Sequence, residues 1–159
     1  MARVRLWQSP DLPYLQRMAI LMTWHVTPAD DKAATTPEVI AHNALLNLDR
    51  VLGTPGGTAV VAEEGGRPVG FLLIGIQPHE RTGEPQGYMA DIFVEPEHRG
   101  QGIPRELQTM GEAYMRQLGL RRSLYWIHTG NRQGQRAAFD HGAKVRGLVI
   151  TKTLNGAGT

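Results

Sequence analysis

The chain has 159 residues, of which 41% are hydrophobic and 20% are charged, and it contains no cysteine. This length fits one domain with a single sizeable core. The absence of cysteine excludes a disulfide scaffold, a thiolate metal site and a cysteine nucleophile. No apolar run approaches the ~20 residues of a membrane span, and residues 1–8 lack the apolar region of a secretory signal. We therefore expect a soluble, cytoplasmic protein.

The formal net charge of +2 is the sum of two unlike halves. Residues 1–98 hold 7 Lys and Arg against 12 Asp and Glu, a net charge of −5, whereas residues 99–159 hold 10 against 3, a net charge of +7. Such asymmetry is typical of a protein whose basic part meets a polyanion, such as a phosphate-bearing cofactor or nucleic acid. Solvated helix faces would give the same composition, so charge alone leaves both interpretations open.

Hydrophobic spacing predicts a strand and two helices in the first third of the chain. Residues 2–8 alternate as a strand does, and Ser9-Pro10 then indicates the start of a helix that runs to about His25. The apolar stripe of this helix comprises Leu12, Leu15, Ala19 and Met22. The polar residues 26–36 are predicted to form a loop. Thr36-Pro37 begins the second helix, whose apolar stripe comprises Ile40, Ala44, Leu48 and Leu52.

The middle of the chain reads as consecutive strands. Two apolar runs, residues 58–62 and 68–76, flank Gly65-Gly66 and predict a hairpin. The second run is apolar throughout, as in a strand that is covered on both faces. A turn-rich loop over residues 77–87 then leads to a strand over residues 88–94.

A helix begins after Gly102, with an apolar stripe of Ile103, Leu107, Met110, Tyr114 and Leu118, and Gly119 ends it. The remaining predicted elements are a strand, a short helix and one bent strand or hairpin around Gly147, at residues 123–128, 132–141 and 143–154. We expect residues 1–154 to form a single domain and residues 155–159 to form a flexible tail.

The most informative stretch is residues 91–105, DIFVEPEHRGQGIPR. A strand ends at Val94, and a glycine loop of residues 99–102 leads directly into a helix. Glycines allow successive N–H groups to converge, and the helix N-terminus adds its positive dipole, so a pyrophosphate would fit there with Arg99 and Arg105 beside it. Many strand–helix turns use glycine for geometry alone, so the motif by itself leaves both interpretations open. Neither GxxxxGK[ST] nor GxGxxG is present.

This stretch resembles motif A of the GNAT superfamily of acyl-CoA-dependent N-acyltransferases, whose pattern is [RQ]xxGx[GA] between a strand and a helix. Arg99, Gly100, Gln101, Gly102 and Ile103 carry the match. Asn131, followed by a short helix that ends in residues 141–143 (HGA), resembles motif B of the same family. The two motifs cover roughly residues 88–145, and the predicted order of elements is also that of the family.

The resemblance implies an α/β fold with a central mixed, mostly antiparallel sheet and helices on both faces. The strands of residues 88–94 and 123–128 would splay apart, and acetyl-CoA would lie in the gap. The implied cofactor-binding residues are the backbone of Ile92, Phe93 and Val94 for the pantetheine, the side chain of Arg99 and the amides of Gly100, Gln101, Gly102, Ile103 and Arg105 for the pyrophosphate, and Asn131 for the pantetheine or the start of its helix.

Two positions depart from the family pattern. Pro104 stands where the family has Gly or Ala, which removes one amide and adds bulk near the phosphates. Many members carry a tyrosine in motif B that protonates the leaving thiolate, and that position falls on Ala138, with Phe139 next to it. Either another group acts as the acid, or water and backbone donors assist, or the protein is not a competent enzyme.

Acetyl transfer to an amine needs a proton acceptor and an N–H donor for the oxyanion, which the backbone near Phe93 could supply. Asp91 shares a strand face with Phe93 and is a candidate catalytic residue, although a carboxylate at a strand end is often simply hydrogen-bonded. His128, at the end of the opposite strand, is the other candidate, with a capped strand-end histidine as the alternative. We expect His79 and Glu80 to be solvated.

The sequence therefore predicts an N-acetyltransferase that transfers acetyl from acetyl-CoA to a primary amine of a small molecule or peptide by direct attack. The alternative is a non-catalytic acyl-CoA-binding or regulatory module of the same fold. The six histidines show no metal-ligand spacing, so no metal is expected. With 6% aromatic residues and no RNA-binding motif, the composition argues against nucleic acid. No membrane partner is expected, and a homodimer stays open. The acceptor would enter from the side of residues 26–36 and 77–87.

Overall fold

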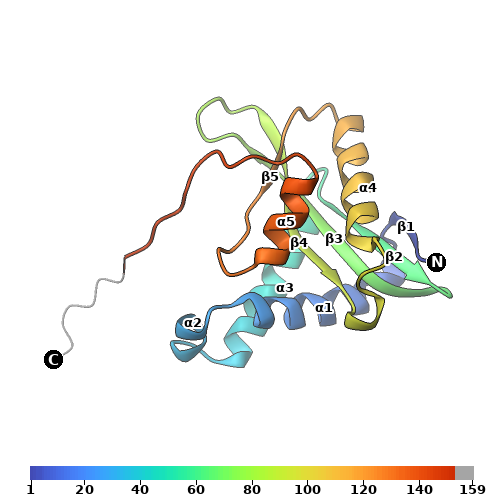
Figure 1. Cartoon of the computed structure of the whole chain (residues 1–159), viewed down its shortest axis with the longest axis horizontal. Coiled ribbons are helices and arrows are strands. Elements are labelled where there is room, and N and C mark those ends of the chain that lie inside the picture. The colour runs from blue at the N-terminus through green and yellow to red at the C-terminus, as the bar shows by residue number, and fades with distance from the viewer. Residues whose placement is uncertain (153–159) are drawn as a thin grey trace.

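Five strands pair in the order of the chain and carry helices on both faces, as the computed structural model of residues 1–152 shows (Figure 1). The strands are β1 (Arg3–Leu6), β2 (Thr58–Glu64), β3 (Arg67–Pro78), β4 (Pro85–Val94) and β5 (Ser123–Tyr125). The helices are α1 (Leu12–Val26), α2 (Ala29–Ala33), α3 (Pro37–Gly53), α4 (Ile103–Gln117) and α5 (Arg132–Asp140). Short 3-10 turns, η1 (Ser9–Asp11) and η2 (Pro96–His98), precede α1 and follow β4.

The sheet is mixed and mostly antiparallel, as predicted. β1 to β4 pair antiparallel in succession, and β5 joins the outer edge of β4 in parallel. Gly65 and Gly66 form the β2–β3 turn with φ of +57° and +77°. Two consecutive positive φ values match the twist that a tight hairpin requires, so the glycine pair determines this turn.

Two apolar layers hold the helices to the sheet. On one face α1 and α3 pack through Leu15 and Leu48 against Phe71, Leu73 and Phe93. On the other face α4 packs through Ile103 and Leu107 against the alternate residues of the same strands, among them Leu72 and Ile74. β3 is therefore buried on both sides, which explains its continuous apolar run. In residues 1–152, no helix has both the length and the apolar character needed to cross a membrane.

Two details of the helices differ from the sequence-based expectation. α2 lies within the predicted loop of residues 26–36, and it has no buried residue. Its first turn holds Asp30 and Asp31, and its last turn holds Lys32. These charges interact favourably with the helix dipole, so they stabilise α2, which has no apolar periodicity. Leu118, predicted on the buried stripe of α4, is 44% exposed because the helix ends there, one residue before Gly119 with φ of +76°.

The predicted last strands are shorter than expected or do not form. β5 ends at Tyr125, so residues 126–128 are not strand, and residues 143–152 contain no strand at all. Apolar, β-branched composition favours a strand only where a partner edge is in register, and the segment that follows α5 runs away from the sheet (Figure 1). Its apolar residues are therefore exposed: Val145, Leu148, Val149 and Ile150. Residues 153–154 and the predicted tail, 155–159, lie outside the described residues.

A buried ionic cluster joins β1, β2 and the η1 turn. The guanidinium of Arg5 donates to both carboxylate oxygens of Asp11, at 2.7 and 3.0 Å, and to Glu63 at 2.8 Å. Asp11 also accepts from the backbone N–H of Gln8 at 2.7 Å. The hydrogen bonds from Arg5 outweigh burial and hold the pKa of Asp11 below its ordinary value.

We expect Asp11→Asn to lower the free energy of unfolding by about 3 kcal/mol at pH 7, because it breaks a buried ion pair. Since the pKa of Asp11 is lower in the folded state, this stabilisation is present above the pKa of the unfolded carboxyl and disappears in acid. Urea titrations at pH 7 and pH 3 would measure this difference. The exposed Asp30→Asn is the matched control, and an equal loss in both variants would contradict the assignment.

Candidate functional site

β4 loses its outer partner halfway along its length. It pairs with β5 only at Gly87–Ser123, Tyr88–Leu124 and Met89–Tyr125. A register shift against β3 then leaves Ala90 as the extra residue of a β-bulge, which bends the strand. Within the described residues, 90–94 have β3 on one side and no strand on the other. The sheet therefore opens between β4 and β5, the two strands that the family resemblance predicted to splay apart.

The alternation of β4 decides which backbone groups face this gap. The N–H of Glu95 donates to Val69 of β3 at 2.9 Å. In an antiparallel pair alternate residues face the partner, so Phe93 also faces β3, whereas Ile92 and Val94 direct their N–H and C=O groups to the open edge. Of the three strand residues predicted to bind the cofactor, these two offer backbone groups to the gap.

The loop that follows β4 has the shape of an anion-binding nest. Gly100 and Gly102 adopt φ of +77° and +82°, which glycine alone adopts at low cost. Among the described residues, no hydrogen-bond acceptor takes the N–H of Gly100, Gln101, Gly102 or Ile103. The N–H of Arg105, predicted to join them, donates instead to the carbonyl of Gly102 at 3.0 Å. The loop thus presents four amides at the N-terminus of α4.

The side chain of Arg99 folds back onto the end of β4. Its Nε donates to the carbonyl of Val94 at 2.9 Å, and its guanidinium lies 5.9 Å from the centroid of the Phe93 ring. This residue therefore lies at the junction of the open strand edge and the glycine loop. Pro104 occupies the first turn of α4. Backbone N–H groups in the first turn have no acceptor within the helix, so the N–H that proline lacks costs no hydrogen bond there.

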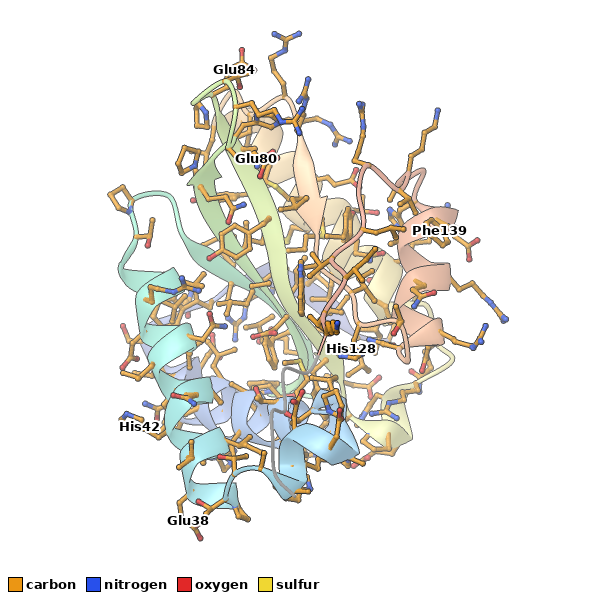
Figure 2. The ribbon with its side chains drawn as sticks, turned by 90° about the vertical axis from the view of Figure 1, so that its left-hand side faces the viewer. Glu38, His42, Glu80, Glu84, His128 and Phe139 are labelled. Carbon is orange, nitrogen blue, oxygen red and sulfur yellow. The ribbon has the colours of Figure 1, made fainter. Side chains whose placement is uncertain are left out.

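The motif B residues shape α5. Asn131 caps this helix, and its Oδ1 accepts from the N–H of Gly134 at 2.9 Å. Ala138 is buried at 2% exposure, and Phe139, the next residue of α5, is 49% exposed (Figure 2). Neither residue has a proton to donate, so the structure retains this departure from the family pattern.

Asp91 lies at the start of the open segment on the α3 face of the sheet. Its carboxylate is partly buried and accepts a hydrogen bond from Nδ2 of Asn47 at 3.3 Å. Burial raises the pKa of Asp91 to about 6, and the hydrogen bond from Asn47 opposes that rise. The carboxylate is thus ionised at neutral pH yet basic enough to take a proton, a combination typical of functional sites.

His128 lies on the stretch between β5 and α5 and is exposed (Figure 2). Its ring is edge-on to Trp126 at 6.5 Å, and its carbonyl accepts from the N–H of Asn131. In residues 1–152, no hydrogen bond or ion pair connects His128 with Asp91. The structure therefore joins Asp91 to the opened strand and leaves His128 unconnected to it.

Asn47 is a residue that sequence analysis missed. It lies on the buried face of α3, among Ala44, Leu48 and Val51, and is the polar member of that stripe. A lone amide at helical spacing within an apolar face is the signal that could have found it, because such an amide needs a partner.

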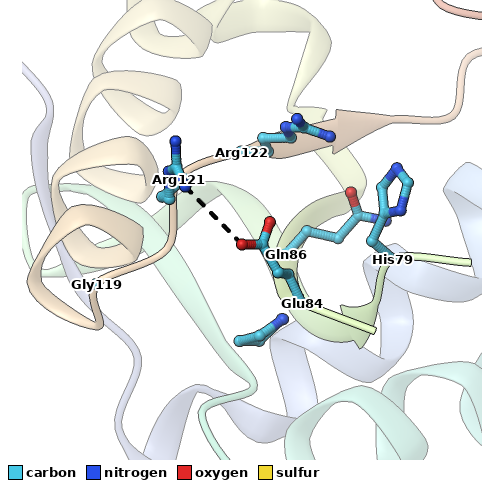
Figure 3. Close-up of a pocket in the computed structure, with 7 residues that line it drawn as sticks. His79, Glu84, Gln86, Gly119, Arg121 and Arg122 are labelled. Carbon is cyan, nitrogen blue, oxygen red and sulfur yellow. Dashed lines mark ion pairs between the residues drawn. The ribbon is translucent and has the colours of Figure 1, made fainter. Parts of the chain in front are cut away.

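A small hollow of about 140 Å³ lies at the far tip of the β3–β4 hairpin, lined by His79, Glu84, Gln86 and Arg121 among others (Figure 3). Arg121 and Glu84 form an ion pair there at 3.8 Å. The hairpin tip and the glycine loop lie at opposite ends of β4, roughly 30 Å apart for a strand of this length. His79 and Glu80 therefore belong to the hairpin tip (Figure 2) and not to the open edge.

A second cluster of titratable groups lies near the glycine loop. Glu95, Glu97 and His98 each bring one ligand-type atom within 4.8 Å of the others. His98 also contacts Glu64 at 3.2 Å through Nε2, which ties the β2–β3 hairpin to the turn after β4. The expectation that the protein holds no metal stays a prediction.

The model of the acetyltransferase (GNAT) family matches residues 16–142, most of this chain. The protein therefore belongs to the GNAT acetyltransferase family, as the two motifs predicted. Among curated proteins, none matches the sequence significantly.

Solved structures superpose along nearly the whole chain. A protein assigned as an acetyl transferase from Pyrococcus furiosus gives a TM-score of 0.82 at 16% identity, over 97% of this chain and 100% of its own. AAC(6')-Iy in complex with the bisubstrate analogue CoA-S-monomethyl-acetylneamine gives a TM-score of 0.74 at 18% identity, over 98% of this chain and 99% of its own. The ribosomal-protein-alanine N-acetyltransferase from Brucella melitensis biovar Abortus 2308 gives a TM-score of 0.66 at 17% identity, over 97% of this chain and 100% of its own. At such identities the likeness establishes the fold.

Because the pKa of Asp91 is raised in the folded state, the free energy of unfolding should depend on pH through this carboxyl. A carboxyl whose pKa is about 6 when folded and near 3.8 when unfolded destabilises the fold progressively as pH rises through that window. We expect Asp91→Asn to raise the free energy of unfolding at pH 8 by up to about 3 kcal/mol, and to give no gain at pH 3.5. Thermal unfolding at both pH values would measure this, with the exposed Asp49→Asn as the control. A gain that does not depend on pH would contradict the prediction.

Proposed function

We propose that this protein is a cytoplasmic N-acetyltransferase that transfers the acetyl group of acetyl-CoA directly to a primary amine. The observation that carries the proposal is the half-paired β4, whose open edge leads into a glycine loop with four free amides. An extended chain that ends in a pyrophosphate matches both parts, because strand-like pairing suits the first and an anion suits the second.

Coenzyme A would bind along this path. The backbone groups of Ile92 and Val94 would pair with the pantetheine, as an added strand does. The amides of Gly100, Gln101, Gly102 and Ile103 would hold the pyrophosphate. Arg99 and Arg105 would supply charge through their side chains, and Asn131 would act by fixing the start of α5. The solved complex of AAC(6')-Iy with a CoA-containing analogue, on the same fold, supports this placement.

Asp91 would act as the general base. It would take the proton of the incoming ammonium, directly or through water, so that the neutral amine attacks the thioester carbon. A C–N bond forms, and the oxyanion of the tetrahedral intermediate accepts a hydrogen bond from the N–H of Ile92 or Val94, since that of Phe93 faces β3. The C–S bond then breaks. The nitrogen loses its second proton to water, and the CoA thiolate gains a proton from the same water chain, because Ala138 and Phe139 cannot donate one. His128 would relay protons at the mouth of the site.

The acceptor would be a small-molecule or peptide amine. Relatives of this fold include enzymes for an aminoglycoside and for a ribosomal protein, and identities of 17–18% to them do not select between these classes. The acceptor would approach from the side of α2 and the β3–β4 hairpin, away from the glycine loop (Figure 1). The net charge of −5 on residues 1–98 favours a cationic amine there.

A second candidate function is a non-catalytic acyl-CoA-binding module. The observation that favours it is the replacement of the motif B tyrosine by Ala138 and Phe139. This module would bind acetyl-CoA as tightly as an enzyme does but would release no thiol in the presence of amines.

Calorimetric titration with acetyl-CoA tests the binding site. We expect Arg99→Gln to weaken the binding about tenfold or more, because it removes a charge-assisted contact to the pyrophosphate. Arg116→Gln, on the exposed side of α4, is the matched control and should bind as the wild type does. No heat of binding with millimolar acetyl-CoA would overturn the proposed cofactor.

Release of free CoA thiol across a panel of amines separates the enzyme from the binding module. We expect turnover with at least one cationic amine and a loss of about a hundredfold or more in kcat/KM for Asp91→Asn at pH 7, the typical effect of removing a general base. Tight binding of acetyl-CoA without thiol release on a broad panel would favour the module. An unchanged rate profile for Asp91→Asn between pH 6 and 9 would exclude Asp91 as the base.

A further inference from the structure

We propose that Asn47 and Arg50 of α3 are positioning residues that set the protonation state of Asp91, an inference that rests on the proposed function of Asp91. The three side chains form a chain from solvent to the opened strand. Nη2 of Arg50 donates to Oδ1 of Asn47 at 2.8 Å, and Nδ2 of Asn47 donates to Oδ2 of Asp91 at 3.3 Å.

Arg50 decides which end of the amide faces Asp91. A guanidinium can only donate, so it fixes the amide oxygen of Asn47 on the solvent side and directs the NH2 group inward. An amide NH2 can donate to a carboxylate but cannot accept the O–H of a carboxylic acid. The oriented amide therefore stabilises the ionised form of Asp91 and not the protonated form.

Without Arg50 the amide would be free to turn over. Its oxygen could then accept a hydrogen bond from protonated Asp91, and the preference for the ionised carboxylate would be lost. Burial already favours the neutral acid, so the Asn47 contact is what keeps the carboxyl available as a base near neutral pH. Arg50 thus acts on Asp91 through an intermediate side chain and not by direct contact.

The surroundings leave Asn47 as the main polar influence on Asp91. Leu73 of β3 is the residue that pairs with Asp91 across the sheet. The charged or titratable groups on the elements packed against this face are Tyr14, Arg17 and His25 of α1, Glu38, His42, Asp49 and Arg50 of α3, Arg67 of β3, and Tyr88 of β4. In residues 1–152 none of these forms an ion pair or hydrogen bond with Asp91, and His128 also forms none. Figure 2 shows Glu38 and His42 on the outer side of α3.

The test is a direct titration of Asp91 in the full-length protein without substrate. The carboxyl carbon of Asp91, assigned by its absence in Asp91→Asn, is followed by NMR between pH 3 and 9. We expect Asn47→Leu, which keeps the branched shape of asparagine but has no polar atoms, to move the midpoint upward by about one pH unit, a tenfold change in the ratio of acid to carboxylate. Arg50→Met should move it in the same direction by less, and Arg50→Lys, which retains a donor, should keep the midpoint close to that of the wild type.

Asn43→Leu provides the matched control. Asn43 lies one turn earlier on the same flank of α3 but is exposed, so its replacement should leave the midpoint unchanged. If Asn47→Leu titrates as the wild type does, or if Asn43→Leu moves the midpoint equally, the inference is wrong. Arg50 is exposed, so Arg50→Met remains a test even if Asn47→Leu does not fold.

A kinetic readout ties the chain to catalysis. With an accepted amine, the acid limb of the kcat/KM profile should move with the NMR midpoint across these variants, whereas a purely structural role would lower the rate without moving the limb. If no amine is acetylated, the proposed function fails, yet the NMR titration still decides whether Asn47 and Arg50 control Asp91. If the acid limb of the kcat/KM profile stays fixed while the NMR midpoint of Asp91 moves, Asp91 is not the general base of the reaction.

Discussion

The loss of a partner strand by the second half of β4 is the constraint on which the site depends. β5 ends at Tyr125, and the bulge at Ala90 turns the remainder of β4 away from it. Backbone N–H and C=O groups need partners, so an open edge inside a folded domain is sustainable only where water or a ligand pairs with it. The glycine loop begins where this edge ends, so the two features form one continuous path that matches the elongated cofactor proposed above.

The same interruption places a carboxylate where a folded protein would ordinarily have an apolar side chain. Asp91 shares its face with Phe93, in the layer that α1 and α3 cover, and burial there raises the pKa of the carboxyl to about 6. A hydrophobic residue at this position would stabilise the fold. Asp91, together with Asn47 on the facing helix, therefore marks a position where the proposed chemistry, and not packing, accounts for the residue.

The two charged halves of the chain occupy different parts of the molecule. The acidic first half builds α1, α2 and α3, and the basic second half builds α4, α5 and the glycine loop (Figure 1). The sign changes at Arg99, the first residue of the glycine loop, whose side chain contacts the open strand. This arrangement suits a reaction between a polyanionic cofactor on one side and a cationic amine on the other, because each partner meets a surface of opposite charge.

The sequence by itself determined the order of elements, the hairpin at Gly65-Gly66, the buried β3 and the family, because these features depend on local periodicity and on motifs within short stretches. It did not determine α2, which charges support, or the failure of residues 143–152 to form a strand, because a strand needs a partner that composition does not reveal. Only the tertiary structure decided that Ile92 and Val94, and not Phe93, face the gap, since that depends on the register against β3. It also decided that Asn47 meets Asp91 across 44 positions of sequence, because only the packing of α3 on the sheet brings the two side chains together.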